Sequence, residues 1–383
     1  MNIFVSAGEP SGDIHGANLI RALKQREPDA RIVGFGGERM EKAGSNLLFL
    51  LTHLAVMWFK NVLANIRQFV QLGKQAEAYF HNEKPDAVVL IDFPGFHFAL
   101  AKRAHAAGIP VYFFVPPQLW GWAGWRVKKV RKWFKGVLTA LPFEEDWYRD
   151  RGVATKYVGH PYFDELAQQT LDETFLTEQR TKGGPIIGVL PGSRNQEVAG
   201  NFAMMLRSLK LIHASRPDAR FLVASFKESQ REMAESMARD SGLPIEFHVG
   251  RTPEIIELST ICLSVSGSVS LEMLHRLKPT VIVYHVGLVF RCLAGLLMRA
   301  KYITLVNLLA DEPIFPEMYG YRDRSKPIAT QVLSWLNDPH ALAERVEKIR
   351  SLRDRVAMPG ACDRAADFLV SRIRTDSARR SAA

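Results

Sequence analysis

The chain opens with the stretch Ile3-Phe4-Val5-Ser6-Ala7-Gly8-Glu9-Pro10-Ser11-Gly12-Asp13, in which an apolar run ends in a glycine-containing turn. A helix is expected to follow from about Ile14 to Gln25. An apolar run without polar alternation is typical of a strand that helices cover on both faces. The stretch therefore predicts the first strand and the first helix of a parallel α/β sheet.

Strand-like runs and helical stretches alternate along the whole chain. In the first half, strands are expected at 31–35, 87–91 and 111–115, and a long helical region at about 56–82. The pattern restarts after the segment 181–185, Thr-Lys-Gly-Gly-Pro, which is the predicted linker. The second half has expected strands at 186–190, 220–224, 245–249, 261–265 and 280–284. Two such halves predict twin Rossmann-like domains, each a doubly wound parallel sheet. They are expected to face a central cleft, with ligands beyond the carboxyl ends of the strands.

The composition indicates the cellular compartment and the class of partner that the protein binds. The three cysteines lie far apart without metal-ligand spacing, and the chain start lacks the regions of a signal peptide, so we expect a cytosolic protein without disulfides or metal. Residues 281–298 are mostly apolar but interrupted by polar residues, and we expect a strand and an amphipathic helix, not a membrane span. The net charge of +10 favours anionic partners. Part of it lies in one run, which otherwise fits a solvated helix face: Arg126, Lys128, Lys129, Arg131, Lys132 and Lys135.

Two strand ends in the first half carry candidate site residues. The turn after the first strand precedes a helix start, where free N–H groups and glycine suit a close ligand, so Ser11 and Gly12 are candidates. Its spacing matches neither a dinucleotide fingerprint nor a P-loop, and the alternative is a tight turn with a helix cap. Asp92 follows the third predicted strand among aromatic residues, which would raise its pKa and suit a general base. The alternative is a turn before proline.

Aromatic residues suggest a surface for an amphiphile. The segment 116–126 holds three tryptophans, whose apolar rings and single N–H donors suit a sugar ring or a lipid interface. Nucleic acid is the less favoured alternative, because no single-strand-binding pattern accompanies the tryptophans. The segment 54–63 fits either a core helix or an exposed patch for acyl chains or membrane. The residues of that predicted patch are Val56, Met57, Trp58, Phe59, Val62 and Leu63.

The second half offers an arginine and a second anion-binding turn. Ser193 and Arg194 lie in a glycine turn between a strand and a helix, where the arginine suits a departing pyrophosphate. Ser266 and Gly267 lie in a small-residue turn before another helix start, which suits an anion. Glu272 suits ribose hydroxyls, or is a first-turn carboxylate stabilised by the helix dipole.

Seven short motifs occur in an order that is specific although each motif alone is weak. They are residues 6–13, Asp92-Phe93-Pro94-Gly95-Phe96, Pro117-Gln118-Leu119-Trp120, Leu141-Pro142-Phe143-Glu144, Val158-Gly159-His160-Pro161, Leu190-Pro191-Gly192-Ser193-Arg194 and Asn307-Leu308-Leu309. Together they closely resemble the lipid-A-disaccharide synthase family over about residues 1 to 350.

The resemblance implies an inverting, metal-independent glycosyltransferase of the GT-B type that needs no cofactor. Its donor would be a UDP-2,3-diacylglucosamine, its acceptor a 2,3-diacylglucosamine 1-phosphate, and its products a β-1,6-linked disaccharide phosphate and UDP. The enzyme would work on the inner face of the cytoplasmic membrane, without nucleic acid. The expected division is 1–180 for the acceptor and membrane side and 181–345 for the UDP-sugar. The remainder, 346–383, is expected as a helix that packs back on the first domain or is exchanged in a homodimer.

The resemblance also implies roles for the candidates. Asp92 would take the proton of the acceptor 6-hydroxyl, and Arg194 would stabilise the leaving UDP. The expected substrate-binding residues are Ser11, Gly12, Gln118, Ser193, Ser266, Gly267, Glu272 and Asn307. The patch at 56–63 would receive acyl chains or bilayer.

The chain departs from the family pattern at a few positions. The family usually has alanine at Pro10 and asparagine at His97, and the segments 124–125, 268–270 and 311–317 also differ. These changes bear on donor geometry and acyl preference more than on the reaction class. Two alternatives stay open: another GT-B transferase or epimerase that uses UDP-N-acetylglucosamine, and a non-catalytic protein that binds nucleotide sugars or anionic membranes.

Overall fold

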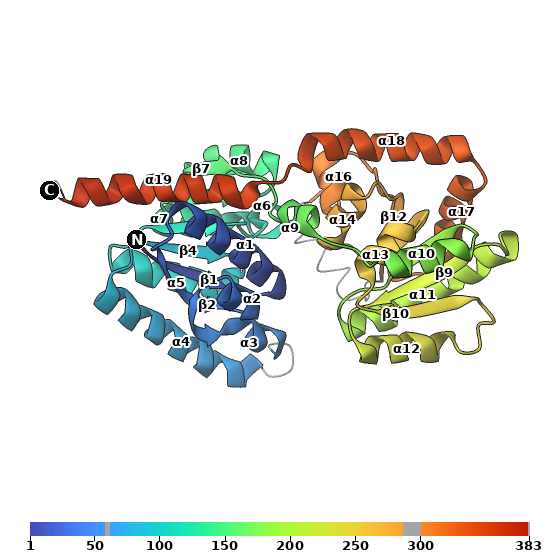
Figure 1. Ribbon diagram of the computed structural model, residues 1–383, viewed down its shortest axis with the longest axis horizontal. Helices are drawn as coiled ribbons and strands as arrows, with labels where there is room; N and C mark the ends of the chain where they lie inside the picture. Colours follow the sequence, from blue (N-terminus) through green and yellow to red (C-terminus); the bar gives the residue numbers. More distant parts are fainter. Residues whose placement is uncertain (58–61, 286–299, 382–383) are drawn as a thin grey trace. The chain divides into compact units, whose positions relative to one another are not determined.

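The computed structural model describes residues 1–57, 62–285 and 300–381, with side chains at 1–54, 66–285 and 300–378 (Figure 1). The chain forms two compact units. Unit 1 contains Met1–Ala167 and Met358–Ala383, and unit 2 contains Gln168–Ala357. Each unit is built on one parallel sheet, as the alternation of apolar runs and helices predicts.

The sheet of unit 1 has the order β3-β2-β1-β4-β5-β6-β7. Its strands are β1 (Asn2–Ala7), β2 (Arg31–Gly36), β3 (Asn46–Leu50), β4 (Ala87–Ile91), β5 (Val111–Phe114), β6 (Gly136–Thr139) and β7 (Thr155–Tyr157). The helices are α1 (Pro10–Arg26), α2 (Glu38–Lys42), α3 (Leu51–Met57), α4 (Val62–Glu83), α5 (Pro94–Ala106), α6 (Leu119–Trp122), α7 (Val127–Trp133), α8 (Pro142–Arg149), α9 (Tyr162–Gln168) and α19 (Ala361–Ser381).

Successive strand residues bury against opposite layers of unit 1. Ile3 and Val5 belong to the core beside α1 and α19, whereas Phe4 packs into the core beside α4 and α5. Because both faces are covered, the strands are apolar throughout, which accounts for the pattern in the sequence.

The last helix of the chain completes unit 1. The carboxylate of Asp164 accepts hydrogen bonds from the backbone N–H groups of Gly360 (2.6 Å), Ala361 (3.0 Å) and Cys362 (2.8 Å), which caps the start of α19. The helix then lies along α1, as Figure 1 shows, and buries its apolar side in the same core. Arg26 on α1 pairs with two carboxylates of α19 at its outer edge.

The sheet of unit 2 has the order β10-β9-β8-β11-β12-β13. Its strands are β8 (Ile186–Leu190), β9 (Arg220–Ser225), β10 (Ile245–Val249), β11 (Ile261–Ser264), β12 (Thr280–His285) and β13 (Glu317–Gly320). The helices are α10 (Glu173–Thr181), α11 (Asn195–Ser215), α12 (Glu228–Ala238), α13 (Thr252–Leu258), α14 (Val269–His275), α16 (Leu305–Ala310), α17 (Ser325–Leu336) and α18 (Pro339–Val356).

The boundaries of the units differ from the expected domain division. Residues 182–185 form the turn between α10 and β8, and this turn lies inside unit 2, because α10 packs against α13 and Gln179 donates a hydrogen bond to Glu246 at 3.0 Å. The chain crosses between the units at 167/168 and again at 357/358. The expected C-terminal helix is two helices: α18 lies in unit 2 and α19 in unit 1.

The expected strand at 280–284 is β12, and the residues after it, 286–299, lie outside the described part of the chain. Among the helices that the structure describes, none combines the length and the apolar character needed to span a bilayer.

Candidate functional site

The candidates of unit 1 gather where the strand order of its sheet reverses direction. β1 and β4 are neighbours there, and Ala7, Ile91 and Phe114 lie in register at the ends of β1, β4 and β5. The following residues leave the sheet at its carboxyl edge, at the point where open α/β sheets bind ligands. Asp92 and the turn with Ser11 and Gly12 therefore share one edge of one sheet.

The backbone at this edge is strained. Asp92, Phe93 and Val115 have positive φ angles of 50°, 47° and 51° although none of them is glycine. Such conformations cost about 1–3 kcal/mol each, and they cluster at functional sites. Their position after two neighbouring strands marks this edge as the candidate active site.

Close packing fixes the ring that follows Asp92. A Cβ atom on Gly8 would lie only 2.3 Å from ring atoms of Phe93, so the turn after β1 requires glycine at this position. The turn after β1 and the turn after β4 are thereby held against each other.

A buried histidine holds the carbonyl group of Asp92. Nδ1 of His97 lies 2.7 Å from the Asp92 carbonyl oxygen, and Nε2 lies 2.9 Å from Oγ of Ser6. Because a carbonyl oxygen only accepts, Nδ1 carries the proton and Nε2 accepts from the hydroxyl of Ser6. Burial lowers the pKa of His97 to about 4, so the ring is neutral. His97 is a positioning residue that links β1 to the backbone of Asp92.

The carboxyl group of Asp92 has the acidity expected of a general base near neutral pH. Burial, and secondarily the negative charge of Glu9, raises the pKa of Asp92 to about 7, against a hydrogen bond from the backbone of Phe93. The aromatic surroundings predicted this direction of shift, whereas the contribution of Glu9 follows from the fold.

The turn before α1 contains two predicted ligand-binding residues and one residue with a structural role. Ser11 is half-buried and Gly12 is buried in the first turn of α1, where backbone N–H groups point out of the helix. Asp13, in contrast, accepts hydrogen bonds from the N–H groups of Gly37 (2.9 Å), Arg39 (3.1 Å) and Met40 (3.1 Å). Asp13 thus caps α2 and not its own helix.

Gln118 and the first tryptophan of the loop follow β5. Gln118 is exposed directly before α6. The indole N–H of Trp120 donates to Glu144 at 3.0 Å, and the other oxygen of Glu144 accepts from the N–H groups of Ala140 and Leu141 at 3.2 and 3.1 Å. The tryptophan motif and the motif at 141–144 therefore meet through one buried carboxyl group, whose pKa burial raises to about 7.

The candidates of unit 2 lie at the corresponding reversal, between β8 and β11. Ser193 and Arg194 follow β8, and both side chains are exposed. The carboxylate of Glu197 accepts from their backbone N–H groups at 3.2 and 3.3 Å and pairs with the Arg194 guanidinium at 3.0 Å. Glutamate in the third helical position suits this capping role, which could have been read from the sequence.

Two buried side-chain amides donate hydrogen bonds to carbonyl oxygens of the turn after β8. Gln230 donates to the Ser193 carbonyl oxygen at 2.7 Å, and Asn201 donates to the Pro191 carbonyl oxygen at 3.1 Å. Asn201 also accepts from the N–H of His285 at the end of β12. Both residues come from other elements, so sequence spacing gave no sign of them.

The second turn that the sequence predicts to bind an anion follows β11. Ser266 is half-buried and its hydroxyl donates to the Ile303 carbonyl oxygen at 2.6 Å, while Gly267 is exposed. Glu272 is buried, and its carboxylate pairs with Arg276 at 3.1 Å. The structure therefore gives Glu272 a protein partner of its own.

Asn307 is buried, and its amide is bonded within unit 2. It donates to the Phe315 carbonyl oxygen (2.7 Å) and to Glu317 (3.0 Å) and accepts from the Phe315 N–H (2.8 Å). Glu317 also accepts from the N–H groups of Ile303 and Thr304 before α16. These bonds give Asn307 the role of a brace that shapes the loop beside Ser266.

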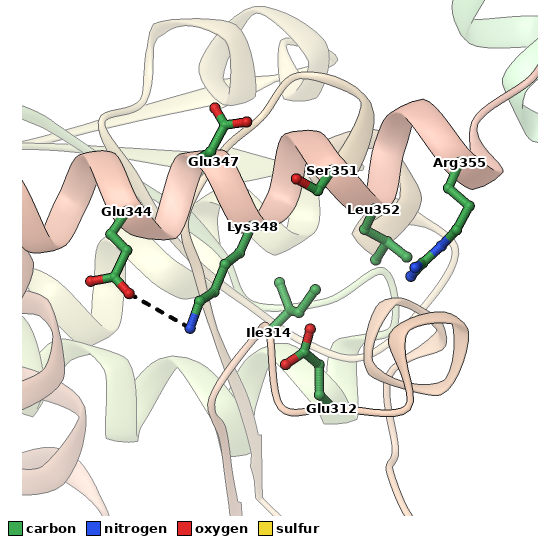
Figure 2. A pocket seen from close by; sticks show the side chains of 8 residues that line it. All are labelled: Glu312, Ile314, Glu344, Glu347, Lys348, Ser351, Leu352 and Arg355. Atoms are coloured by element: carbon green, nitrogen blue, oxygen red, sulfur yellow. Dashed lines mark ion pairs between the residues drawn. The ribbon is translucent and has the colours of Figure 1, made fainter.

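Three further features of the chain bear on where a site can lie. The predicted patch of Val56, Met57, Trp58, Phe59, Val62 and Leu63 lies outside the described side chains. A pocket of about 230 Å³ beside α18 in unit 2 contains none of the candidates (Figure 2). Among the described residues, no group of three or more histidine, cysteine or acidic side chains is arranged to hold a metal ion.

Comparison with known proteins gives a family. The family model described as lipid-A-disaccharide synthetase matches residues 3–368. The lipid-A-disaccharide synthase of Myxococcus xanthus is 33% identical over 369 residues, which is 96% of each chain. That of Pseudomonas syringae is 32% identical over 97% of each chain.

Solved structures share the fold at low identity. The UDP-N-acetylglucosamine 2-epimerase of Neisseria meningitidis, bound to UDP-GlcNAc, has a TM-score of 0.65 at 12% identity over 97% of this chain and 99% of its own. MurG of Acinetobacter baumannii has a TM-score of 0.60 at 13% identity over 97% and 99%. The fold is the GT-B fold, as expected.

The hydrogen bonds of His97 yield a stability prediction. His97→Leu leaves the Ser6 hydroxyl and the Asp92 carbonyl group buried without a partner, and each such loss costs about 1–3 kcal/mol. We expect the free energy of unfolding to fall by about 2–4 kcal/mol in urea titration. His105→Leu, an exposed position on the same helix, is the matched control and should change it by less than about 0.5 kcal/mol. Equal effects of the two changes would contradict the assigned bonds.

Proposed function

The chain belongs to the lipid-A-disaccharide synthetase family, and from this premise we propose that Asp92 and Arg194 perform the glycosyl transfer. The enzyme is a UDP-sugar-dependent hexosyltransferase. Its proposed substrates are UDP-2,3-diacylglucosamine and 2,3-diacylglucosamine 1-phosphate, and its products are the β-1,6-linked lipid A disaccharide 1-phosphate and UDP. Family membership weighs against the epimerase and against the non-catalytic binding protein.

In the proposed step, the acceptor 6-hydroxyl oxygen attacks the anomeric carbon of the donor. The hydroxyl proton moves to the carboxylate of Asp92, and the bond between the anomeric carbon and the UDP oxygen breaks with its electron pair going to UDP. A single displacement inverts the anomeric carbon. The step needs a base for the acceptor and charge stabilisation for the leaving group.

The raised pKa of Asp92 at a strained strand end is the observation that carries the proposal. A base with a pKa near the working pH combines a usable ionised fraction with enough basicity. His97 and Phe93 hold the backbone from which this carboxylate projects.

UDP is proposed to bind at the two turns of unit 2. The exposed guanidinium of Arg194 supplies charge, and the turn with Ser266 and Gly267 supplies N–H groups at a helix start. Arg194 would exchange Glu197 for the pyrophosphate, since both are anions. Asn307 would act indirectly, by shaping the loop next to Ser266.

We also propose which residues contact the acceptor and the ribose, and where the enzyme works. Ser11, Gly12 and Gln118 would contact the acceptor, and Glu272 the ribose. The enzyme would work as a peripheral protein on the inner face of the cytoplasmic membrane, with residues 56–63 toward acyl chains. The acylation of both proposed substrates supports this location, and a homodimer would be compatible with it.

Mass spectrometry of the products tests the proposed function. The purified protein with UDP-diacylglucosamine and the monosaccharide 1-phosphate should give the disaccharide phosphate. Asp92→Asn should lower the rate by about 10²–10⁴-fold, the range for loss of a general base. Asp29→Asn, an exposed site in the same unit, should leave the rate near parental. Epimerised UDP-sugar without disaccharide would contradict the proposal.

The charge of Glu9 yields a prediction for the pH profile. An ionised base is required, so kcat/KM should fall tenfold per pH unit below about 7, where Asp92 becomes protonated. Glu9→Gln removes a charge that raises the pKa of Asp92, so the acidic limb should move to lower pH. Glu41→Gln, an exposed carboxylate on α2, is the control. If the acidic limb of kcat/KM stays in place in Glu9→Gln, a group other than Asp92 causes that limb.

Substitution of Arg194 tests its proposed role in stabilising the leaving group. Arg194→Ala should lower kcat by about 10²-fold or more, because a directed charge at the departing pyrophosphate is lost. Arg207→Ala, on the helix α11 that Arg194 precedes and paired with Asp323, is the matched control and should change kcat little. A loss of only two-fold in Arg194→Ala would argue against the role.

A further inference from the structure

Unit 1 has a second candidate membrane surface, formed by other residues than 56–63. Trp122 and Trp125 are 46% and 64% exposed, although both have large apolar rings. They flank the turn that leads into α7. We give the name basic tryptophan face to the exposed residues Trp122, Trp125, Lys128, Lys129, Arg131 and Lys132, together with the half-buried Arg126.

The charges of this face are not compensated within the described structure. α7 buries Val130 and packs Val127 against the core, which leaves its lysines and Arg131 on the solvent side. The segment 116–135 contains no acidic residue. No ion pair of the described residues engages Arg126 or the basic residues at 128–132, whereas Lys135 pairs with Asp376 at 2.5 Å. Such a face attracts a large anionic partner.

The cations and the rings form one surface. The guanidinium of Arg126 lies 5.0 Å from the ring of Trp122 and 5.1 Å from that of Trp125, and the ammonium of Lys129 lies 6.0 Å from Trp125. Arg126 therefore covers a face of each indole ring, and stacking of nucleic-acid bases there would have to displace it. Indole rings beside cations suit the headgroup region of a bilayer, where both ring and charge find partners.

We propose that the basic tryptophan face seats unit 1 on an anionic phospholipid bilayer. Lipid phosphates would meet the lysines and arginines, and the two indoles would enter the headgroup layer. The inference rests on the proposed function in one respect, since acylated substrates place the reaction at a bilayer. It adds which surface makes the contact and that the contact is selective for anionic lipid.

Sedimentation of the full chain with vesicles tests the proposal. Vesicles of phosphatidylcholine with added phosphatidylglycerol should bind the protein, and phosphatidylcholine alone should bind it much less. Each basic residue near the surface contributes about five-fold in affinity, so Lys128→Glu with Lys129→Glu should weaken binding by about 25-fold or more. Trp125→Ala should weaken it several-fold.

Matched controls come from unit 2. Lys210→Glu with Lys326→Glu makes the same change of net charge at exposed sites, and Phe226→Ala removes a ring that is also 64% exposed. Both controls should bind within about two-fold of the parent. Equal losses in the face and control variants, or parental binding in the face variants, would overturn the proposal, as would preference for a single-stranded oligonucleotide over vesicles.

Activity separates this proposal from the proposed function. With substrates dispersed in detergent, the Lys128→Glu and Lys129→Glu double variant should form disaccharide at the parental rate while failing to bind vesicles. If the parent protein binds vesicles but forms no disaccharide, the proposal for the basic tryptophan face stands and the proposed glycosyl transfer is contradicted.

Discussion

The hydrogen bond from His97 to the carbonyl oxygen of Asp92 is the constraint on which the chemistry proposed for unit 1 depends. It holds two successive non-glycine residues in a left-handed backbone, a costly arrangement that only a well-packed surrounding sustains. The same ring accepts from Ser6 on β1, and Gly8 makes room for Phe93. Contacts of neighbouring residues thereby fix the backbone that carries the Asp92 carboxyl group.

Unit 2 also fixes the turn after one of its strands, but by hydrogen bonds from side chains and not by a strained backbone. Its turn after β8 is held by side chains from α11 and α12, with Gln230 and Asn201 at the carbonyl groups and Glu197 at the N–H groups. The strained non-glycine residues of unit 1 have no equivalent in this turn, where the positive φ angle belongs to Gly192. A turn held by exchangeable hydrogen bonds could adapt to the proposed pyrophosphate, whereas a tightly packed backbone would hold the proposed base at a fixed place.

The sequence predicted the strands inside the two sheets, apart from β6, and missed most of the edge strands that the structure describes. Strands 87–91, 186–190 and 245–249 have the expected bounds, but β3, β7 and β13, which lie at sheet edges, and the interior strand β6 were missed. Strand ends also predicted where the candidates lie. The bonds of His97 to Ser6 and of Asn307 to Phe315 could not be predicted, because they depend on how separate elements pack. The first crossing between the units, at 167/168 and not at 180/181, could not be predicted for the same reason: α10 precedes the glycine-rich segment in the sequence, but its contacts are with unit 2.

The cap that Asp164 places on α19 has a consequence for how the chain matures on the ribosome. Proteins usually fold their amino-terminal parts first as they are synthesised. Here the helix that packs on α1 is translated only after the whole of unit 2. Until α19 emerges, the core that it shares with Leu19 and Leu23 of α1 is incomplete, so unit 1 can close only after unit 2 has been made.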